Sequence, residues 1–223
     1  MKKSTRKVVR RSPSHTVRLL HLPHLQKEPV EADSALERDF VHIAALFSST
    51  VSITHQPFKL VWEDASYTPD FLVCFKDGSQ LVVEVKPVPH VEKYRPLFDR
   101  AAAKLNGRQT PFLVVTDQHL RTESRTANAL LIRRYAKTSF PADDCERALQ
   151  RVNESTAGIS VAELCSIAGV CRELILHLVA WHRLALSADL SFGPEARVFK
   201  VQNSKETSNA LLFTSWIDAQ VWG

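Results

Sequence analysis

Hydrophobic and polar residues recur along the first part of the chain with two different periods, which predict amphipathic helices and short strands. Ser34 precedes an apolar stripe of helical spacing from Leu36 to Phe47, and Glu37 stands three positions after it, as in a capping box. Further helices are expected at 91–105 and 119–135. Strands are expected at 51–54, 58–62, 71–75, 81–85 and 111–116. This order predicts an α/β fold in which helices flank a mixed sheet.

The pattern changes after Phe140-Pro141. Helices are expected at 144–153, 161–168 and 171–182, and two strands at 184–190 and 197–201. Three helices followed by a two-stranded wing are typical of a small winged helix-turn-helix domain. We therefore expect a basic N-terminal arm (1–30), an α/β domain (31–138) and a winged-helix-like C-terminal domain (142–223). The last is expected to be a separable module that docks protein or DNA.

Three charged residues interrupt strands that otherwise have the composition of a core: Asp70, Glu84 and Lys86. Because side chains alternate between the two faces of a strand, Glu84 and Lys86 share one face. The face of Asp70 depends on the register of the hairpin that joins the two strands.

Two hairpin loops are compatible with the sequence. A two-residue loop, Asp77-Gly78, places Asp70 opposite Val85 and away from Glu84. A three-residue loop, Lys76-Asp77-Gly78, places Asp70 directly across from Glu84 and gives Gly78 the left-handed position of a G1 bulge. We predict the three-residue loop, because only this register gathers both acids and the lysine.

Such a group has the chemistry of phosphodiester hydrolysis. Opposed carboxylates repel each other at neutral pH, and a divalent cation with a preference for oxygen, such as Mg²⁺, relieves the repulsion. A lysine on the same face can orient or deprotonate a water, or stabilise charge that builds on phosphorus. The alternative is a salt-bridged face of an amphipathic strand. Pro69, directly before Asp70, and the apolar character of both strands favour the catalytic site.

The chain carries a formal net charge of +5, and its basic residues are unevenly distributed. A disordered arm that contacts phosphate, or a solvated tail, accounts for the cluster Lys2, Lys3, Arg6, Lys7, Arg10 and Arg11. Arg121, Arg125, Arg133 and Arg134 are further candidates for contacts with DNA phosphates. In the C-terminal domain, the candidates for a recognition surface are Arg172, His177, Trp181 and His182.

Amino-acid composition also indicates the cellular compartment in which the protein works. The four cysteines show no CxxC spacing, which favours buried thiols in a reducing cytosol over a zinc or disulfide site. No apolar stretch approaches the ~20 residues that cross a bilayer, and no secretory signal follows the basic N-terminus. We therefore expect a cytoplasmic protein with no membrane partner.

Five motifs in this order resemble the TnsA family, which belongs to the PD-(D/E)xK nuclease superfamily. They are SALERDF (34–40), HQPFKL (55–60), YTPDFLV (67–73), VEVKP (83–87) and FLVVTD (112–117). The resemblance covers about residues 30–137 and implies a restriction-endonuclease-like fold for the domain at 31–138. It also implies a Mg²⁺-dependent DNA endonuclease, the subunit of a heteromeric bacterial transposase that cleaves the 5′ strands at transposon ends.

By this resemblance Glu37 joins Asp70 and Glu84 as a metal ligand, and Lys86 is the catalytic base or charge stabiliser. Members of the family can carry Gln at the position of Glu84. Mn²⁺ is expected to substitute for Mg²⁺. From the sequence alone, Glu37 is most simply explained as a partner in the helix cap and a charge that stabilises the helix dipole, with the ligand role as the alternative. Gln56, before Pro57, either lies near the metal or only ends a strand.

The family likeness also implies partners. They are DNA at the transposon ends, a TnsB-like DDE transposase subunit and a TnsC-like ATPase regulator, in the bacterial cytoplasm and at the nucleoid when active. Two other functions stay open. One is a catalytically inert winged-helix protein that binds DNA or acts as an adaptor, and the other is a stand-alone restriction or repair nuclease.

Overall fold

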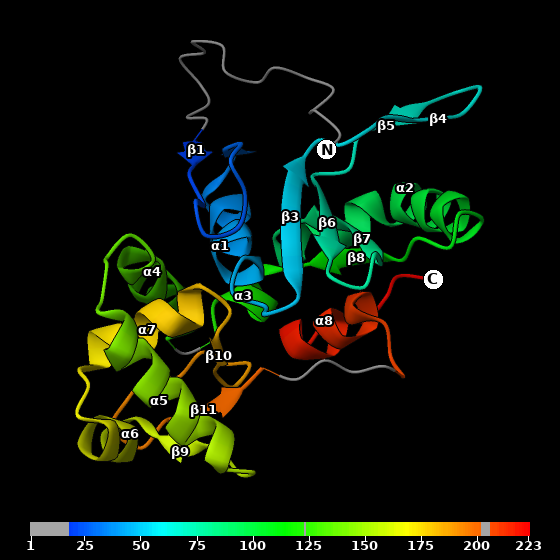
Figure 1. The fold of residues 1–223 in the computed structure, drawn as a ribbon. Coiled ribbons are helices and arrows are strands. Elements are labelled where there is room, and N and C mark those ends of the chain that lie inside the picture. Colours follow the sequence, from blue (N-terminus) through cyan, green and yellow to red (C-terminus); the bar gives the residue numbers. More distant parts are fainter. Residues whose placement is uncertain (1–17, 123, 202–205) are drawn as a thin grey trace.

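The computed structural model describes residues 18–122, 124–201 and 206–223 (Figure 1). At its centre is a four-stranded sheet of order β3-β6-β7-β8. Its strands are Thr50–His55, Phe71–Phe75, Gln80–Val85 and Phe112–Val115. The first three pair antiparallel, whereas β8 runs parallel to β7. The fold is therefore mixed α/β, with helices flanking a mixed sheet, as the sequence predicts.

The β6–β7 hairpin has the predicted three-residue loop. Phe71 pairs with Val83, and the same register continues to Cys74 and Gln80. The Phe75 N–H donates to the Ser79 carbonyl at 3.0 Å, and Gly78 adopts φ +82° inside the loop. The left-handed backbone explains why glycine occupies this position.

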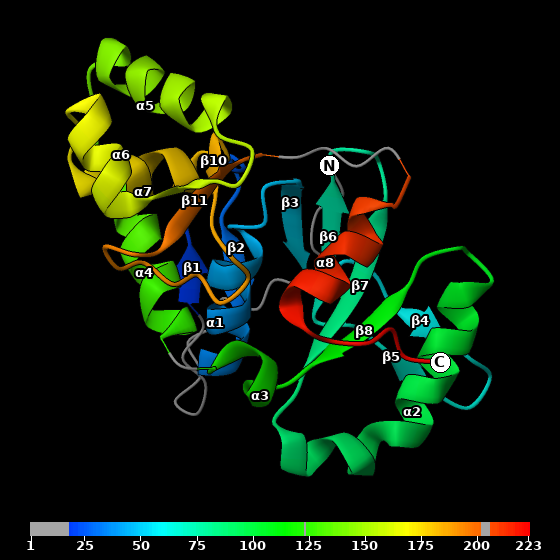
Figure 2. The same cartoon turned by 90° about the horizontal axis from the view of Figure 1, so that it is seen from below.

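Helices cover both faces of the sheet. On one face, α1 (Ala35–Ala44) and α8 (Asn209–Ile217) pack against Phe71 and Val83, and Figure 2 shows α8 lying across the strands. On the other face, Phe98 of α2 (Val88–Asn106) packs with the inward side chains of β6, β7 and β8. The small hairpin of β4 (Leu60–Val61) and β5 (Ser66–Tyr67) joins this second cluster.

Local hydrogen bonds explain where α1 begins. The Ser34 hydroxyl accepts from the Glu37 N–H at 3.1 Å, which confirms the predicted N-cap. The Glu37 carboxylate turns back to accept from the Asp33 N–H at 2.8 Å, one residue before the cap that a capping box uses. This hydrogen bond uses one carboxylate oxygen of Glu37, so the other oxygen is left for a metal ion.

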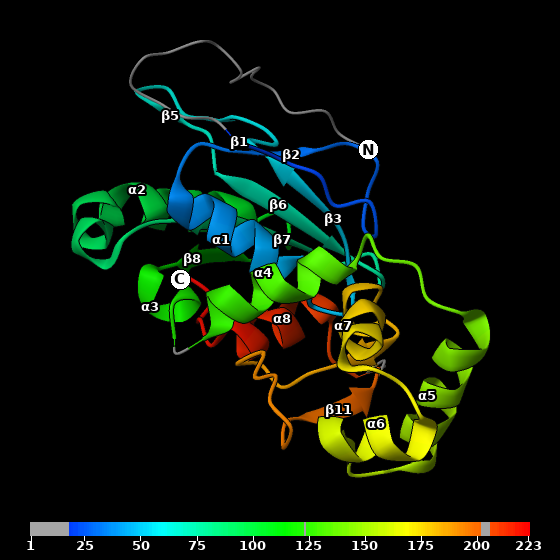
Figure 3. The same ribbon diagram turned by 90° about the vertical axis from the view of Figure 1, so that its left-hand side faces the viewer.

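Beyond β8 the expected single helix is divided into α3 (Asp117–Leu120) and α4 (Arg125–Tyr135). Figure 3 shows α4 beside α1. The next elements are α5 (Ala142–Glu154), β9 (Ile159–Ser160), α6 (Val161–Ala168), α7 (Arg172–Ala180), β10 (Leu184–Ala185) and β11 (Arg197–Lys200). The three strands form a second small sheet of order β10-β11-β9. Ser160 caps α6, and Gly169 ends it at φ +63°. None of the helices in the described part of the chain combines the length and apolar character needed to cross a membrane.

Two segments pack in places that differ from the expected division into arm, α/β domain and C-terminal domain. Residues 18–30 were expected in the arm, but β1 (Arg18–Leu20) pairs with β2 (Val30–Ala32), and Leu22 is fully buried. Helix α8 falls within 142–223, yet it packs against β6 of the central sheet. After it, the Trp222 N–H donates to the Phe112 carbonyl at 2.8 Å. The C-terminal segment is therefore not separable as a whole, because its end completes the core of the first part.

Removing the ring of Phe213 tests this packing. Phe213 is fully buried against Phe40, Phe75 and Trp216, so Phe213→Ala should lower the free energy of unfolding by about 3–5 kcal/mol. Leu211 on the same helix is 45% exposed, and Leu211→Ala should cost less than about 0.5 kcal/mol. Urea denaturation followed by circular dichroism measures both. Equal effects of the two variants would contradict the placement of α8.

The buried imidazole of His42 should make stability depend on pH. Burial and the charges of Arg133 and Arg38 lower the pKa of His42 from 6.5 to about 4. Between these values the unfolded chain takes up a proton that the folded chain refuses, so stability falls as the pH drops through this range. Relative to His42→Leu, the wild type should lose about 2 kcal/mol of unfolding free energy between pH 7 and pH 5. Urea denaturation at each pH measures the unfolding free energy of both proteins. The same dependence on pH in the wild type and in His42→Leu would refute this prediction.

Candidate metal centre

Asp70 and Glu84 face each other at one end of the sheet. Asp70 directly precedes β6, and one further step of the β6–β7 register pairs it with Glu84. The Asp70 carboxylate accepts a hydrogen bond from the Val85 N–H at 2.8 Å, which holds it against β7. Glu84 is only 3% exposed and lies in a central strand, between β6 and β8. The expected meeting of the two acids thus follows from the observed register.

Both oxygens of Glu84 have partners. The Lys86 ammonium lies 2.8 Å from Oε1, and the Tyr67 hydroxyl donates to Oε2 at 2.5 Å. The Lys86 side chain also lies over the ring of Tyr94, 5.1 Å from its centroid. The backbone N–H of Lys86 donates to the Val115 carbonyl, so the ladder with β8 continues past the last residue of β7. Lys86 therefore reaches the same face as Glu84, as the alternation predicts.

Negative charge is in excess at this point. Burial raises the pKa of the Asp70 carboxyl well above its ordinary value, and the charges of Glu84 and Glu37 raise it further. Burial also raises the pKa of Glu37, where Asp33 and Glu84 add to the effect. These three carboxylates come from the residue before β6, from β7 and from α1, and they have the oxygen donors that suit a hard divalent cation.

Two groups keep their protons beside these acids. Burial acts to lower the pKa of Lys86, but the charges of Glu84 and Asp70 outweigh it, so the pKa lies above its ordinary value. Burial and the Glu84 charge raise the pKa of the Tyr67 hydroxyl well above 10, which keeps it a hydrogen-bond donor. Ammonium and hydroxyl together hold the Glu84 carboxylate.

Glu37 also borders a second group of polar side chains. The Nε2 atom of His55 lies 3.7 Å from Glu37 Oε2 and 4.0 Å from Asp33 Oδ2. Gln56 adopts φ +43°, and its backbone N–H donates to the Asp70 carbonyl at 2.7 Å. Its side-chain amide lies 3.4 Å from Asp33 Oδ2. Gln56 is thus close to the carboxylates, and its relation to a metal stays a prediction.

The patterns in the sequence did not point to three of these residues: Asp33, His55 and Tyr67. Two of them lie inside the quoted motifs, since His55 begins HQPFKL and Tyr67 begins YTPDFLV. Tyr67 is an odd number of residues away from Asp70 in the sequence, so the alternation of a strand does not place the two side chains on one face. Only the return of the β4–β5 hairpin brings its hydroxyl to Glu84.

The basic residues expected to contact DNA differ in their exposure. The six residues from Lys2 to Arg11 lie outside the described residues. Arg121 is exposed and pairs with Asp39 at 3.2 Å. Arg125, in contrast, is 3% exposed; it donates to the carbonyls of His119 and Trp216, and its guanidinium stacks on the Trp216 ring. This burial corrects the expectation that Arg125 contacts DNA, because no face of it is left for a phosphate.

The candidates for a recognition surface on α7 are mostly engaged within the chain. His177 hydrogen-bonds to the Tyr135 carbonyl, and Trp181 donates to the Ala136 carbonyl, each at 3.0 Å. His182 bonds to the Ala45 carbonyl at 2.8 Å. These contacts dock α7 onto the end of α4 and onto the residue after α1. Helix α7 is therefore packed against the first part of the chain.

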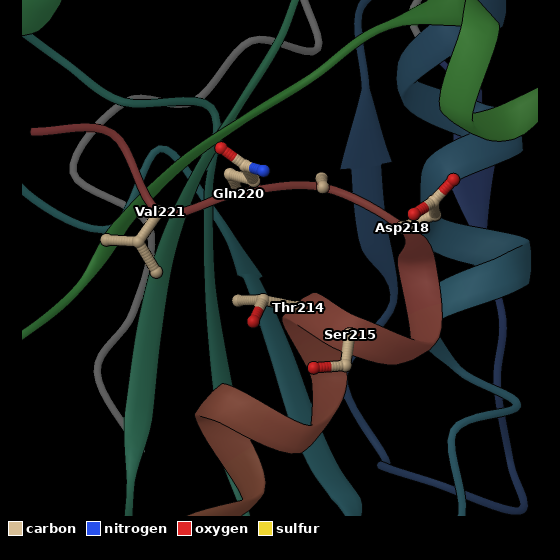
Figure 4. A pocket seen from close by; sticks show the side chains of 6 residues that line it. Thr214, Ser215, Asp218, Gln220 and Val221 are labelled. Atoms are coloured by element: carbon tan, nitrogen blue, oxygen red, sulfur yellow. The ribbon is translucent and has the colours of Figure 1, made fainter.

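A separate hollow lies at the C-terminal end of α8 (Figure 4). Its lining consists of Thr214, Ser215, Asp218, Ala219, Gln220 and Val221. Asp218 is the only acid among them and stands at φ +61°, where it caps the helix. No predicted site residue lines this hollow, so it adds nothing to the carboxylate group.

Searches with models of protein families and among curated proteins found no match to this chain. Function is therefore inferred from the motifs and from the geometry of the carboxylates.

Replacing Asp70 by Asn should stabilise the protein when divalent ions are chelated. Because the pKa of Asp70 is raised in the folded state, ionisation costs stability at every pH above the unfolded value of 3.8, and the cost grows as the pH rises. Asn keeps the acceptor for the Val85 N–H. Thermal unfolding in EDTA should show a higher Tm for Asp70→Asn at pH 7, with the gap closing toward pH 4. The control is Asp77→Asn. Burial acts to raise the pKa of Asp77, but hydrogen bonds from Asn209 and Ser79 outweigh it and hold the pKa below its ordinary value, so that variant should gain nothing. A gap that is absent at pH 7 would contradict the electrostatic account.

Proposed function

We propose that this chain is a metal-dependent DNA endonuclease, the subunit of a heteromeric transposase that cleaves the 5′ strands at transposon ends. One observation carries the nuclease proposal: Asp70 and Glu84 lie opposite each other on one sheet face, with the Lys86 ammonium on the same face. The motif resemblance supports the transposase context.

The residues fit a Mg²⁺ ion. Asp70 and Glu84, with Glu37, would hold it, and their mutual repulsion favours a cation between them. A bound ion supplies charge neutralisation at the phosphate and lowers the pKa of a coordinated water. In the reaction a water oxygen forms a bond to phosphorus, one P–O ester bond breaks, and the departing oxygen takes a proton.

Other residues of the chain would stabilise the phosphate and hold the carboxylates in position. The Lys86 ammonium, on the face of both acids, is suited to hydrogen-bond a phosphoryl oxygen as charge builds there. The Tyr67 hydroxyl fixes one oxygen of Glu84, and the Val85 N–H fixes one oxygen of Asp70. Tyr67 is therefore a positioning residue in this proposal.

The C-terminal part supports a docking role. The order α5-β9-α6-α7-β10-β11 and its three-stranded sheet support the proposal that residues 142–200 form a winged helix-turn-helix. A winged helix usually reads DNA with its second motif helix in the major groove. Here six of the nine residues of α7 are buried, and its end is bonded to α4. We therefore propose that this part binds protein, namely the TnsB-like or TnsC-like partner of the bacterial cytoplasm.

The nuclease proposal is tested with single substitutions in the reconstituted transposase. Asp70→Ala and Lys86→Ala should each slow Mg²⁺-dependent nicking of an end-bearing duplex at least about 100-fold. Asp64, an exposed acid of the β4–β5 loop paired with Arg100, is a matched control, and Asp64→Ala should nick at the wild-type rate. Nicking by Asp70→Ala at the rate of the control would refute the catalytic assignment.

The transposase context has its own readout. If the partner joins the 3′ ends while the 5′ strands stay attached, Asp70→Ala should give cointegrates after replication. Wild-type protein should give simple insertions. Sequenced junctions from a transposition assay distinguish the two products, and simple insertions at undiminished frequency from the variant would refute this role.

A further inference from the structure

A second group of ligand atoms adjoins the carboxylates of the proposed nuclease site. Asp33 directly precedes the cap of α1, Glu37 lies in its first turn, and His55 ends β3. One ligand atom from each lies within 4.8 Å of the other two. The group contains a nitrogen donor, which Asp70 and Glu84 lack.

His55 lacks the hydrogen bonds that a buried imidazole normally has. The residue is 3% exposed, and neither ring nitrogen has a hydrogen-bond partner among the described residues. Its Nε2 points to the carboxylates of Glu37 and Asp33, and the Phe71 ring lies 5.4 Å from the imidazole. The Asp33 Oδ1 atom is also buried without a hydrogen-bond partner. Buried polar groups without a partner destabilise a fold, which favours a bound group at this site.

Strand pairing holds the imidazole in this position. His55 pairs with Phe71 across β3 and β6, and the next residue turns so that its N–H bonds to the Asp70 carbonyl. The same pairing therefore fixes His55 and presents Asp70.

We propose that Asp33, Glu37 and His55 form a site for a divalent first-row transition ion, adjacent to Asp70 and Glu84 and sharing Glu37 with them. Imidazole favours such ions over Mg²⁺ and Ca²⁺, whereas carboxylates accept both kinds. Two donors about 2.1 Å from one ion lie roughly 3.0 Å apart when adjacent and 4.2 Å apart when opposite. The observed 3.7 and 4.0 Å fall between these limits.

The shared carboxylate connects this site to the proposed function. The charge of Glu37 helps to raise the pKa of Asp70, and the charge of Glu84 helps to raise the pKa of Glu37. An ion held by Asp33, Glu37 and His55 would therefore lower the negative charge felt by the other two acids. This consequence rests on the nuclease proposal, but binding of the ion does not.

Binding of Mn²⁺ tests the site directly. The full chain is titrated with Mn²⁺ in a large excess of Mg²⁺, and free Mn²⁺ is followed by electron paramagnetic resonance. The background variant is Asp70→Asn with Glu84→Gln, which removes the Mg²⁺ ligands that are not shared. We expect this variant to keep one Mn²⁺ site, and His55→Ala in the same background to weaken it at least about tenfold.

A second variant guards against a folding defect. Asp33 is partly exposed and Asp33→Asn keeps its shape, so the chain should fold while Mn²⁺ binding weakens in the same way. The matched control is His90→Ala at an exposed position, which should leave Mn²⁺ affinity unchanged. The proposal is overturned if His55→Ala and Asp33→Asn both bind Mn²⁺ like the background. It is equally overturned if the background binds none. Nicking assays decide the nuclease proposal separately, because this titration needs no DNA.

Discussion

The register of the β6–β7 hairpin controls the rest of the site. Gly78 at φ +82° permits a loop of three residues, and every pair above the loop follows from it, up to Asp70 opposite Glu84. A shift of one residue would send Asp70 to the other face and leave Glu84 with no acid across from it. The same loop anchors α8, because the Asp77 carboxylate accepts from both the Ser79 and the Asn209 N–H groups. One turn thus links the chemistry to the packing of the last helix.

Stability alone does not explain the arrangement of the carboxylates. Buried acids side by side are costly, as the raised pKa of Asp70 shows, and a protein selected only for stability would not keep them. The Lys86 ammonium and the Tyr67 hydroxyl offset part of that cost at Glu84. Such a strained arrangement of charge is typical of functional sites. The inert-adaptor alternative offers no reason for it.

Hydrogen bonds at the end of α7 fix this helix against α4 and α1. Trp181 and His177 bond to carbonyls at the end of α4, and His182 bonds to the residue that follows α1. Helix α1 carries Glu37, so α7 supports the element that brings the third carboxylate. A partner that binds the C-terminal part would act next to a helix that contributes to the site, without any need for a long relay.

Local patterns in the sequence determined much of this protein. The alternation in β6 and β7, the glycine in the turn, the Ser34 and Ser160 caps and the apolar strand β8 all follow from short-range physics. The alternation also places Glu84 and Lys86 on one face, but the sequence was compatible with two hairpin registers, and the structure shows the one that brings Asp70 opposite Glu84. Only the tertiary structure decided the rest. The return of α8 to the sheet, the burial of Arg125 under Trp216, and the contacts of Tyr67 and His55 with the acids join residues far apart in the chain. Such contacts depend on how separate elements pack, and no local period of hydrophobic residues encodes that.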